Sequence, residues 1–198
     1  MLFETFVLGQ LQNNCYVLSN KPGHAVIIDP AENGDKFADY LAQKQLQPDA
    51  VFLTHSHFDH IGGLTSLVSR TGAPVYLHRD EYAIVPVLSQ GRLKVETRDY
   101  PEIMDAAGLS FRIYHTPGHS PGSVCIRTED LLFTGDTLFF GSCGRIDFPG
   151  GSWEQMASSL RLLATLDGEI SVFPGHGESS RIDTERKYNP YLRKAMEA

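Results

Sequence analysis

The segment from Thr54 to His60, which reads THSHFDH, constrains this chain more than any other, because four of its side chains can bind metal. Residues 50–53 before it are apolar and have the length of a buried strand, and residues 61–70 after it read as a helix. The segment therefore occupies the loop between the end of a strand and the start of a helix. Loops in such places bring together side chains from distant parts of a rigid scaffold.

The spacing of these side chains indicates how they are arranged. In an extended loop, His55 and His57 point to the same side, because alternate residues of an extended chain share a face. Asp59 and His60 follow where the chain turns into the helix, so they face another direction. One loop could then supply ligands to two metal ions, and its mixture of imidazole and carboxylate suits zinc or iron. The alternative is a polar turn that is rich in histidine by chance.

Three later residues share the setting of this loop. His119, Asp136 and His176 each lie one to three residues beyond an expected strand or strand-like turn, next to a glycine. Glycine lets the backbone approach a metal ion without a clash from Cβ. These residues are therefore further candidate ligands. The other histidines lack that setting and are expected to be ordinary surface or core residues: His24, His78 and His115.

The composition excludes several classes of protein. The 198 residues, of which 41% are hydrophobic, predict one domain spanning 1–198. A net charge of −7 argues against a nucleic-acid binder, and no apolar run is long enough for a membrane span. We expect no signal peptide, and the cysteines Cys15, Cys125 and Cys143 form no CxxC pair. The expected location is therefore a reducing cytoplasm.

Strands and helices are expected along most of the chain. Apolar segments between turn residues predict strands at 2–8, 15–19, 25–29, 50–54, 75–77, 109–114, 123–127, 131–134 and 170–173. Helical spacing of apolar residues predicts helices at 33–46, 61–70, 79–85 and 152–166, with a further short helix after Pro190. Ser152 is expected to cap the clearest helix. Residues 86–101 are expected to be loop with some strand, and the glycine-rich residues 139–151 a functional loop.

Asp29 ends the third expected strand and has two interpretations. Its carboxylate either caps a turn or supports the histidine-rich loop from behind. The sequence favours neither of them.

The full set of candidate ligands resembles that of the metallo-β-lactamase superfamily, and the resemblance runs across nearly all of the chain. It implies an α/β fold, namely a four-layer αβ/βα sandwich of two mixed sheets with helices outside and a metal site at one edge. It also implies two metal ions. His55, His57 and His119 would hold the first, Asp59, His60 and His176 would hold the second, and Asp136 would bridge them.

The same resemblance implies hydrolysis. A hydroxide between the two ions would attack an ester-type carbonyl, and Asp59 would be the catalytic residue that orients it as well as a ligand. Two divalent ions are expected as cofactors, with zinc as the default and iron or manganese as reasonable for a mixed nitrogen and oxygen set. A thiolate leaving group needs little help from an acid, because thiols have a pKa of about 8.5.

Four further motifs resemble the glyoxalase II group, which hydrolyses hydroxyacyl-glutathione thioesters such as S-lactoylglutathione. They occupy residues 133–138, 144–148, 173–177 and 185–192. The expected partner is therefore a small-molecule thioester. The resemblance is greatest to the short bacterial members, since we expect this chain not to carry the helical C-terminal extension of the eukaryotic type. Asp147 and Glu178 also stand where that type places tyrosines near the thioester.

Arg145 is the candidate residue for substrate binding. Its planar guanidinium suits a substrate carboxylate, and the alternative is a structural pair with Asp147.

Two other functions stay open. A persulfide dioxygenase resembles this chain in its Gly-Arg-x-Asp-Phe run, and its single iron would be held by His55, His119 and Asp136. A metal-stabilised binding module without turnover is the second. The presence of His60 and the segment 174–178 favour the two-metal hydrolase.

Overall fold

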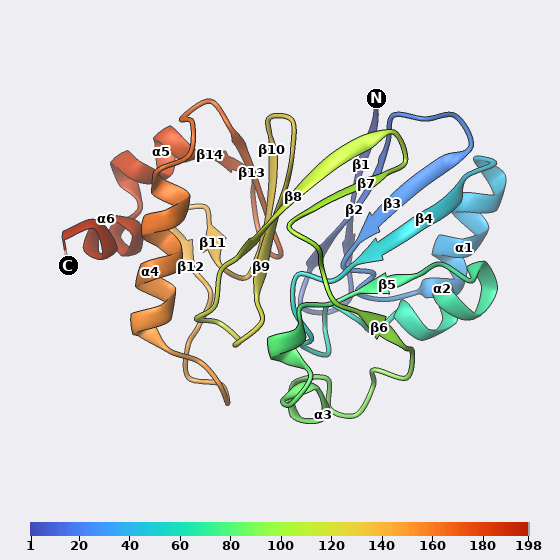
Figure 1. Ribbon diagram of the computed structural model, residues 1–198, viewed down its shortest axis with the longest axis horizontal. Helices are drawn as coiled ribbons and strands as arrows, with labels where there is room; N and C mark the ends of the chain where they lie inside the picture. The colour runs from blue at the N-terminus through green and yellow to red at the C-terminus, as the bar shows by residue number, and fades with distance from the viewer. Residues whose placement is uncertain (198) are drawn as a thin grey trace.

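Two six-stranded sheets face each other at the centre of the molecule, and helices cover their outer faces (Figure 1). The computed structural model describes residues 1–197. The first sheet, in spatial order, consists of β1 (Leu2–Leu8), β2 (Asn13–Ser19), β3 (His24–Ile28), β4 (Gln47–Phe52), β5 (Val75–Tyr76) and β6 (Thr97–Arg98). The second, in spatial order, consists of β14 (Ser180–Arg181), β13 (Ser171–Pro174), β10 (Leu131–Gly135), β9 (Val124–Thr128), β8 (Leu109–His115) and β7 (Ile103–Ala106).

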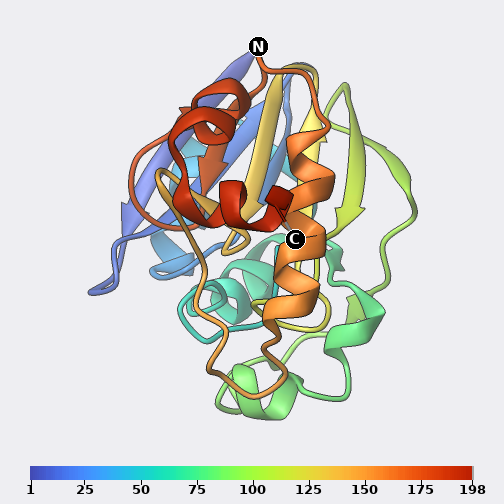
Figure 2. The ribbon, with the colours of Figure 1, turned by 90° about the vertical axis from the view of Figure 1, so that its left-hand side faces the viewer.

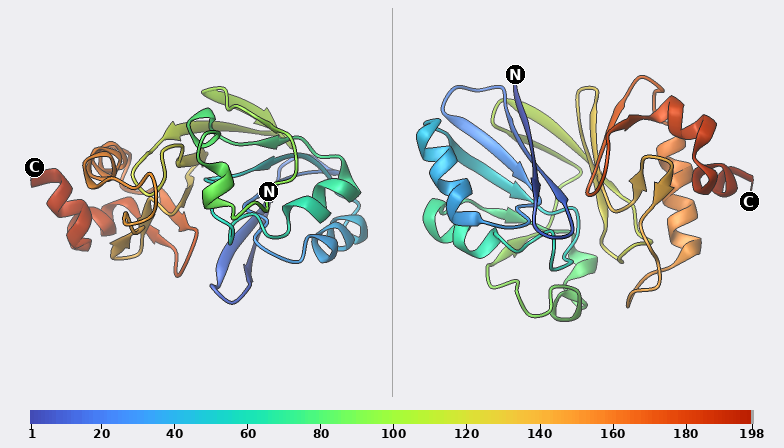
Figure 3. Two further views of the ribbon diagram at one scale, coloured as in Figure 1. Left: turned by 90° about the horizontal axis from the view of Figure 1, so that it is seen from below. Right: turned by 180° about the vertical axis from the view of Figure 1, so that it is seen from behind.

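Both sheets are mixed because tight turns join some neighbouring strands and helical crossovers join others. In the first sheet, β1, β2 and β3 pair antiparallel, whereas β3 to β6 pair parallel. The crossovers α1 (Gly34–Gln43) and α2 (Leu64–Thr71) lie on its outer face (Figure 3). In the second sheet only β10 and β13 pair parallel, and α4 (Trp153–Ala164) lies between them in the chain.

The helices of the second half pack on the outer face of the second sheet (Figure 2). Ser152 caps α4 as expected, because its hydroxyl accepts a hydrogen bond from the Gln155 backbone at 3.4 Å. Met156, Leu160 and Leu163 are buried in a cluster shared by this helix, the sheet and α6 (Pro190–Glu197). With helices outside and two sheets inside, the expected αβ/βα sandwich is confirmed.

The main core lies between the sheets and is rich in aromatic rings. Phe52 from β4 and Phe111 from β8 are fully buried, with ring centroids 5.0 Å apart in an edge-to-face arrangement. Tyr16 and Phe133 make a second contact between the sheets, with centroids 4.9 Å apart. Burial of each large apolar side chain contributes about 1.5–3 kcal/mol. This packing fixes the sheets relative to each other and with them the loops at their edges.

Several elements differ from those expected. The helix expected from residue 61 begins at Leu64, because residues 61–64 form a tight turn in which the Leu64 amide donates to the Ile61 carbonyl at 3.0 Å. The Gly63 amide donates to Pro30 at 2.8 Å. The helix expected at 79–85 is two shorter elements, η1 (Arg79–Glu81) and α3 (Val85–Leu88). Within the segment expected to be a loop, β11 (Leu138–Phe139) and β12 (Ser142–Cys143) form a small hairpin.

Three elements had no corresponding expectation: the strands β7 and β14 and the helix α5. β7 is an edge strand whose Ile103 and Asp105 are exposed, so its pairing with β8 rather than its own apolar pattern defines it. α5 (Ile182–Tyr188) is seven residues long and buries only Ile182 and Glu185. Across residues 1–197, every helix is too short or too polar to cross a bilayer.

Candidate metal centre

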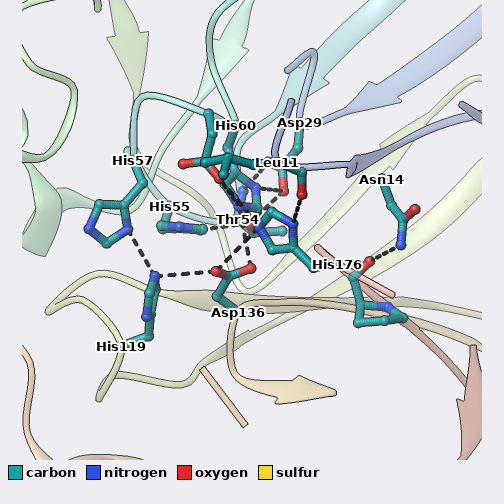
Figure 4. Close-up of polar contacts among 12 residues, drawn as sticks. Leu11, Asn14, Asp29, Thr54, His55, His57, His60, His119, Asp136 and His176 are labelled. Carbon is teal, nitrogen blue, oxygen red and sulfur yellow. Dashed lines mark hydrogen bonds and ion pairs between the residues drawn. The ribbon is translucent and has the colours of Figure 1, made fainter. Parts of the chain in front are cut away.

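The seven candidate ligands converge at one edge of the two sheets, and Figure 4 labels all of them except Asp59. Four separate loops supply them. His55, His57, Asp59 and His60 come from the loop after β4, His119 from the loop between β8 and β9, Asp136 from the residue after β10, and His176 from the loop after β13. These segments, which are distant in the sequence, therefore meet in the structure as expected.

Short distances connect the side chains of different loops. His119 Nε2 lies 2.9 Å from His57 Nδ1 and 3.5 Å from Asp136 Oδ2. His60 Nε2 lies 3.3 Å from Asp136 Oδ1. Three overlapping groups have all ligand atoms within 4.8 Å of one another: His55, His57 and His119; His55, His60 and Asp136; and Asp59, His60 and His176. The first and third match the two sets implied by the resemblance, and the second connects them through Asp136.

The histidine rings are oriented by hydrogen bonds on the side away from the centre. Nδ1 of His119 donates to the backbone carbonyl of Arg145 at 2.7 Å, and Nδ1 of His176 donates to that of Leu11 at 3.0 Å. Nδ1 of His55 faces the hydroxyl of Thr54 at 3.0 Å. Each bond fixes the ring and leaves Nε2 directed at the centre, as in metal sites where an outer partner orients the ligand.

Buried polar atoms at the centre show that these residues fit metal ions. Among residues 1–197, Nε2 of His55 and Nε2 of His57 are buried without a hydrogen-bond partner, and Nε2 of His60 and Oδ1 of Asp136 face each other at 3.3 Å. An unpaired buried polar atom costs about 1–3 kcal/mol, so such atoms call for a ligand. Four or more nitrogen donors together with carboxylates suit zinc, iron or manganese. The His and Asp residues are thus positioned for metal binding.

Two of these histidines are held neutral. Burial, together with the neighbouring His119 and His60, lowers the pKa of His57 to about 4. The pKa of His55 also falls well below its usual value, first because of burial and then because of His60 and His119. A neutral imidazole has a free lone pair, which is the form that binds a metal ion.

In the group of Asp59, His60 and His176, the pKa of the buried histidine shifts in the opposite direction. Burial favours the neutral form of His60, but the carboxylates of Asp136 and Asp29 outweigh it and raise the pKa of His60 well above its usual value. Burial raises the pKa of Asp59, but the hydrogen bond from His176 and the charge of His60 give a net lowering. Asp59 is therefore a carboxylate at neutral pH.

Asp29 supports the histidine-rich loop. It is 2% exposed, and its carboxylate accepts hydrogen bonds from the Thr54 amide at 2.8 Å, from the Thr54 hydroxyl at 2.6 Å and from His60 Nδ1 at 2.9 Å. Of the two interpretations left open by the sequence, the structure agrees with support from behind the loop.

Gly175 leaves room for the ligands. A Cβ atom at this position would lie 2.7 Å from Cε1 of His60 and closer still to Oδ1 of Asp136. Any side chain here would therefore displace two candidate ligands, which explains a glycine directly before His176.

A cavity of about 660 Å³ opens beside the centre. Its apolar wall includes Leu11, Phe58, Phe139 and Phe148. Its polar wall includes five of the seven candidate ligands: His57, Asp59, His119, Asp136 and His176. Arg145 lines it as well, with its guanidinium 4.1 Å from the Phe148 ring centroid. Two bonds of 2.6 Å join this guanidinium to Asp147, so the structural pair considered from the sequence exists. Its role in substrate binding stays a prediction.

The histidines expected to be ordinary lie outside the centre. His24 Nδ1 contacts Asp49 at 2.7 Å. His78 and His115 stack with ring centroids 4.0 Å apart, and Asp80 lies beside them. One ligand atom from each of His78, Asp80 and His115 lies within 4.8 Å of the others, so these residues form a separate, partly exposed group away from the centre. Nε2 of His115 donates to the Pro121 carbonyl at 2.8 Å.

Glu81 is a buried residue that the sequence analysis did not single out. It is fully buried, and its carboxylate accepts hydrogen bonds from the Ser56 amide at 3.2 Å, from the Ser56 hydroxyl and from the Gly122 amide at 2.9 Å. The sequence around an acidic residue in a short helical segment does not indicate that the residue is buried. These contacts could therefore be identified only from the structure.

Residues 8–176 match the family model described as the metallo-beta-lactamase superfamily. The chain belongs to this superfamily. Three relatives match over 97% of this chain and 98% of their own length. They are an uncharacterized protein of Mycobacterium tuberculosis (37% identical), the probable metallo-hydrolase YqgX of Bacillus subtilis (36%) and the hydroxyacylglutathione hydrolase GloC of Haemophilus influenzae (30%).

Solved structures of this superfamily superpose closely. The B3 metallo-beta-lactamase BLEG-1 has a TM-score of 0.88 and 34% identity, covering 96% of this chain and 99% of that one. TTHA1623 in a di-iron-bound form has a TM-score of 0.85 and 34% identity, covering 95% and 99%. ETHE1 from Myxococcus xanthus has a TM-score of 0.82 and 31% identity, covering 96% and 84%. The same fold and related sequences thus occur with differently named activities.

Proposed function

We propose that this protein is a metal-dependent hydrolase of small-molecule thioesters such as S-lactoylglutathione, with a function of the glyoxalase II type. The observation that carries the proposal is the convergence of four loops on one centre in which Nε2 of His55 and Nε2 of His57 are buried without a hydrogen-bond partner. The relative from Haemophilus influenzae, which is named as a hydroxyacylglutathione hydrolase, supports this substrate class.

The proposed cofactors are two divalent metal ions. His55, His57 and His119 would hold one, and Asp59, His60 and His176 the other. Asp136 approaches both groups, because its carboxylate lies 3.5 Å from His119 and 3.3 Å from His60. Zinc is the default for such a site, and the di-iron form of TTHA1623 supports iron as an alternative. Bound ions of this kind supply Lewis acidity and lower the pKa of water.

Asp59 is the proposed catalytic residue. Its Oδ2 lies 3.3 Å from His176 Nε2, and its lowered pKa keeps it ionised. Asp59 also lines the cavity, so its carboxylate can accept a hydrogen bond from a nucleophilic water and orient that water toward a substrate carbonyl.

The cavity supports binding of a small organic substrate. Leu11, Phe139 and Phe148 supply apolar surface against an acyl group and limit access of bulk water to the reacting carbonyl. We propose that Arg145 binds a carboxylate of the substrate, in exchange for its present partner Asp147.

A single-iron persulfide dioxygenase is the second candidate, and the likeness to ETHE1 favours it. His55, His119 and Asp136 would hold its iron. The proximity of Asp59, His60 and His176, which such a site does not require, favours the hydrolase. A metal-stabilised binding module without turnover is the third.

The test combines metal quantification with activity on one purified sample. We expect about two metal ions per chain and hydrolysis of S-lactoylglutathione, followed as loss of the thioester absorbance. Removal of metal by a chelator should abolish hydrolysis, and added zinc should restore it. Asp59→Asn should lower kcat by about 100-fold or more, whereas Asp105→Asn, at an exposed position on β7, should not change it.

Other outcomes identify the alternatives. One iron per chain with persulfide-dependent oxygen consumption supports the dioxygenase and refutes the hydrolase. Cleavage of a β-lactam without cleavage of thioesters would refute the thioester substrate and indicate an activity like that named for BLEG-1. Fully metal-loaded protein that cleaves no thioester, ester, lactone or β-lactam supports a binding module.

A further inference from the structure

The three-histidine group is built from two loops that lie far apart in the sequence. His55 and His57 flank Ser56 in the loop after β4, whereas His119 lies in the loop between β8 and β9. These loops also belong to different sheets. A metal site functions only when its ligands are held within about 0.5 Å of the required geometry. Some contact must therefore fix the separation of the two loops.

Glu81 makes that contact. One carboxylate oxygen accepts the Ser56 amide at 3.2 Å and the Ser56 hydroxyl, and the other accepts the Gly122 amide at 2.9 Å. Ser56 lies between two candidate ligands, and Gly122 lies three residues after His119. A Cβ atom at Gly122 would lie 2.6 Å from the Glu81 backbone nitrogen, so the second loop rests directly on this residue.

The carboxylate of Glu81 is unusual for a buried acidic group. It is fully buried, and within residues 1–197 it forms no ion pair with a lysine, arginine or histidine. A buried charge is costly unless hydrogen bonds compensate it. Here all partners are donors, which matches the acceptor-only character of a carboxylate. An apolar side chain could fill the same space, but it could not hold two loops by hydrogen bonds.

The element that carries Glu81 is itself anchored. Arg79 of η1 contacts Asp99 through its side chain at 2.6 Å, and the Arg79 amide donates to the same carboxylate at 3.0 Å. The stacked pair of His78 and His115 joins this turn to the start of the His119 loop. Glu81 thus extends from a fixed base to both ligand-bearing loops.

We propose that Glu81 is a positioning residue that sets the affinity of the three-histidine group for its metal ion and does not affect the group of Asp59, His60 and His176. The inference rests on the metal binding that the proposed function requires. Loss of an outer partner of this kind typically lowers metal affinity by about 10–100-fold.

Competition titration of metal-free protein with Zn²⁺ against a chromophoric chelator tests this inference. We expect Glu81→Gln to lower the affinity for one of the two zinc ions by about 10–100-fold. The affinity for the other should stay within about threefold of the wild-type value. Asp49→Asn is the matched control, because it also replaces a carboxylate that accepts a backbone amide, that of Ala107, but lies outside the groups of candidate ligands. It should leave both equivalents unchanged, even if it lowers the melting temperature.

A double variant identifies the affected ion. His119→Ala disrupts the three-histidine group, so adding Glu81→Gln to it should change the affinity of the remaining zinc less than about twofold. The inference is wrong if Glu81→Gln binds both equivalents as wild type does, weakens both equally or is matched by Asp49→Asn. If Glu81→Gln does not fold, Ser56→Ala removes one hydrogen bond of the contact, and unchanged affinity in that variant also refutes the inference.

The same titration separates this inference from the proposed function. If the wild-type protein binds no metal, the proposed function fails. If the wild type binds two ions and hydrolyses thioester while Glu81→Gln titrates normally, only the role of Glu81 is wrong.

Discussion

Nδ1 of His60 lies 2.9 Å from Oδ2 of Asp29, and both side chains are buried. The bond directs the opposite nitrogen of His60 to within 3.3 Å of Asp136. Asp29 also accepts two hydrogen bonds from Thr54, the residue before the first candidate ligand. One carboxylate therefore fixes both the ring of His60 and the start of the loop that carries it.

Replacing Asp29 by asparagine should weaken metal binding by His60. The amide offers one acceptor oxygen in place of two, so at least one of three buried hydrogen bonds is lost. We expect about a 10–100-fold loss of affinity for one zinc equivalent, measured by competition titration. Asp49→Asn is the matched control, since Asp49 also pairs with a histidine and a backbone amide but lies outside the centre. Equal losses in both variants would contradict the prediction.

Acidification should release the two metal ions at different pH values. In metal-free protein His57, with a pKa of about 4, is neutral at pH 5–7 and free to bind. His60 has a raised pKa and holds its proton near neutral pH, so a metal ion must displace that proton. Falling pH therefore weakens the group of Asp59, His60 and His176 first. Metal content after dialysis at successive pH values should show two steps, and titration calorimetry in two buffers should show proton release at pH 7. A single step at one pH would contradict this.

Truncating the core between the sheets should destabilise the whole molecule. Phe52→Ala removes a fully buried ring that contacts Phe111 from the opposite sheet, and such changes cost about 3–5 kcal/mol. Urea denaturation followed by circular dichroism measures the loss. Phe140→Ala, at a side chain that is 54% exposed, should change the free energy of unfolding by less than about 0.5 kcal/mol. A small effect of Phe52→Ala would mean that this packing does not hold the sheets together.

Arg145 should affect substrate binding more than turnover. If its guanidinium binds a substrate carboxylate, Arg145→Gln raises KM by about tenfold, since a hydrogen bond to a charged group contributes about 1.5–3 kcal/mol. For a substrate whose carboxylate has been converted to an amide, wild type and Arg145→Gln should have the same KM. Asp147→Asn frees the guanidinium from its present pair and should leave KM equal or lower. An increase of KM in both variants would identify the pair as purely structural.

The sequence predicts the parts of this molecule that depend on local spacing. His55, His57, Asp59 and His60 lie at the end of a buried strand, and that setting alone indicates the loop and its two faces. Ser152 and the apolar residues that follow it predict α4 almost to the residue. Such features are readable because the cause and the element lie in the same short segment.

The parts that the sequence does not predict depend on contacts between distant segments. β7 has a mostly exposed pattern and exists because β8 pairs with it. The carboxylate of Glu81 accepts a hydrogen bond from Ser56, 25 positions away, and the backbone carbonyl of Arg145 accepts one from His119, 26 positions away. No sequence pattern around Glu81 or Arg145 indicates these contacts. The orientation of each ligand is therefore set by partners that only the folded chain brings into place.

The origin of the ligands also dictates when metal can enter. Residues 55–60 follow a strand of the first sheet, whereas His119, Asp136 and His176 follow strands of the second. During synthesis on the ribosome, the nascent chain therefore lacks a complete centre until His176 has emerged, long after the first sheet has been translated. Under the proposed function, filling of the group of Asp59, His60 and His176 is accordingly a late event in the biogenesis of this protein. A translation product that stops before His176 would leave the ribosome with one ligand group incomplete.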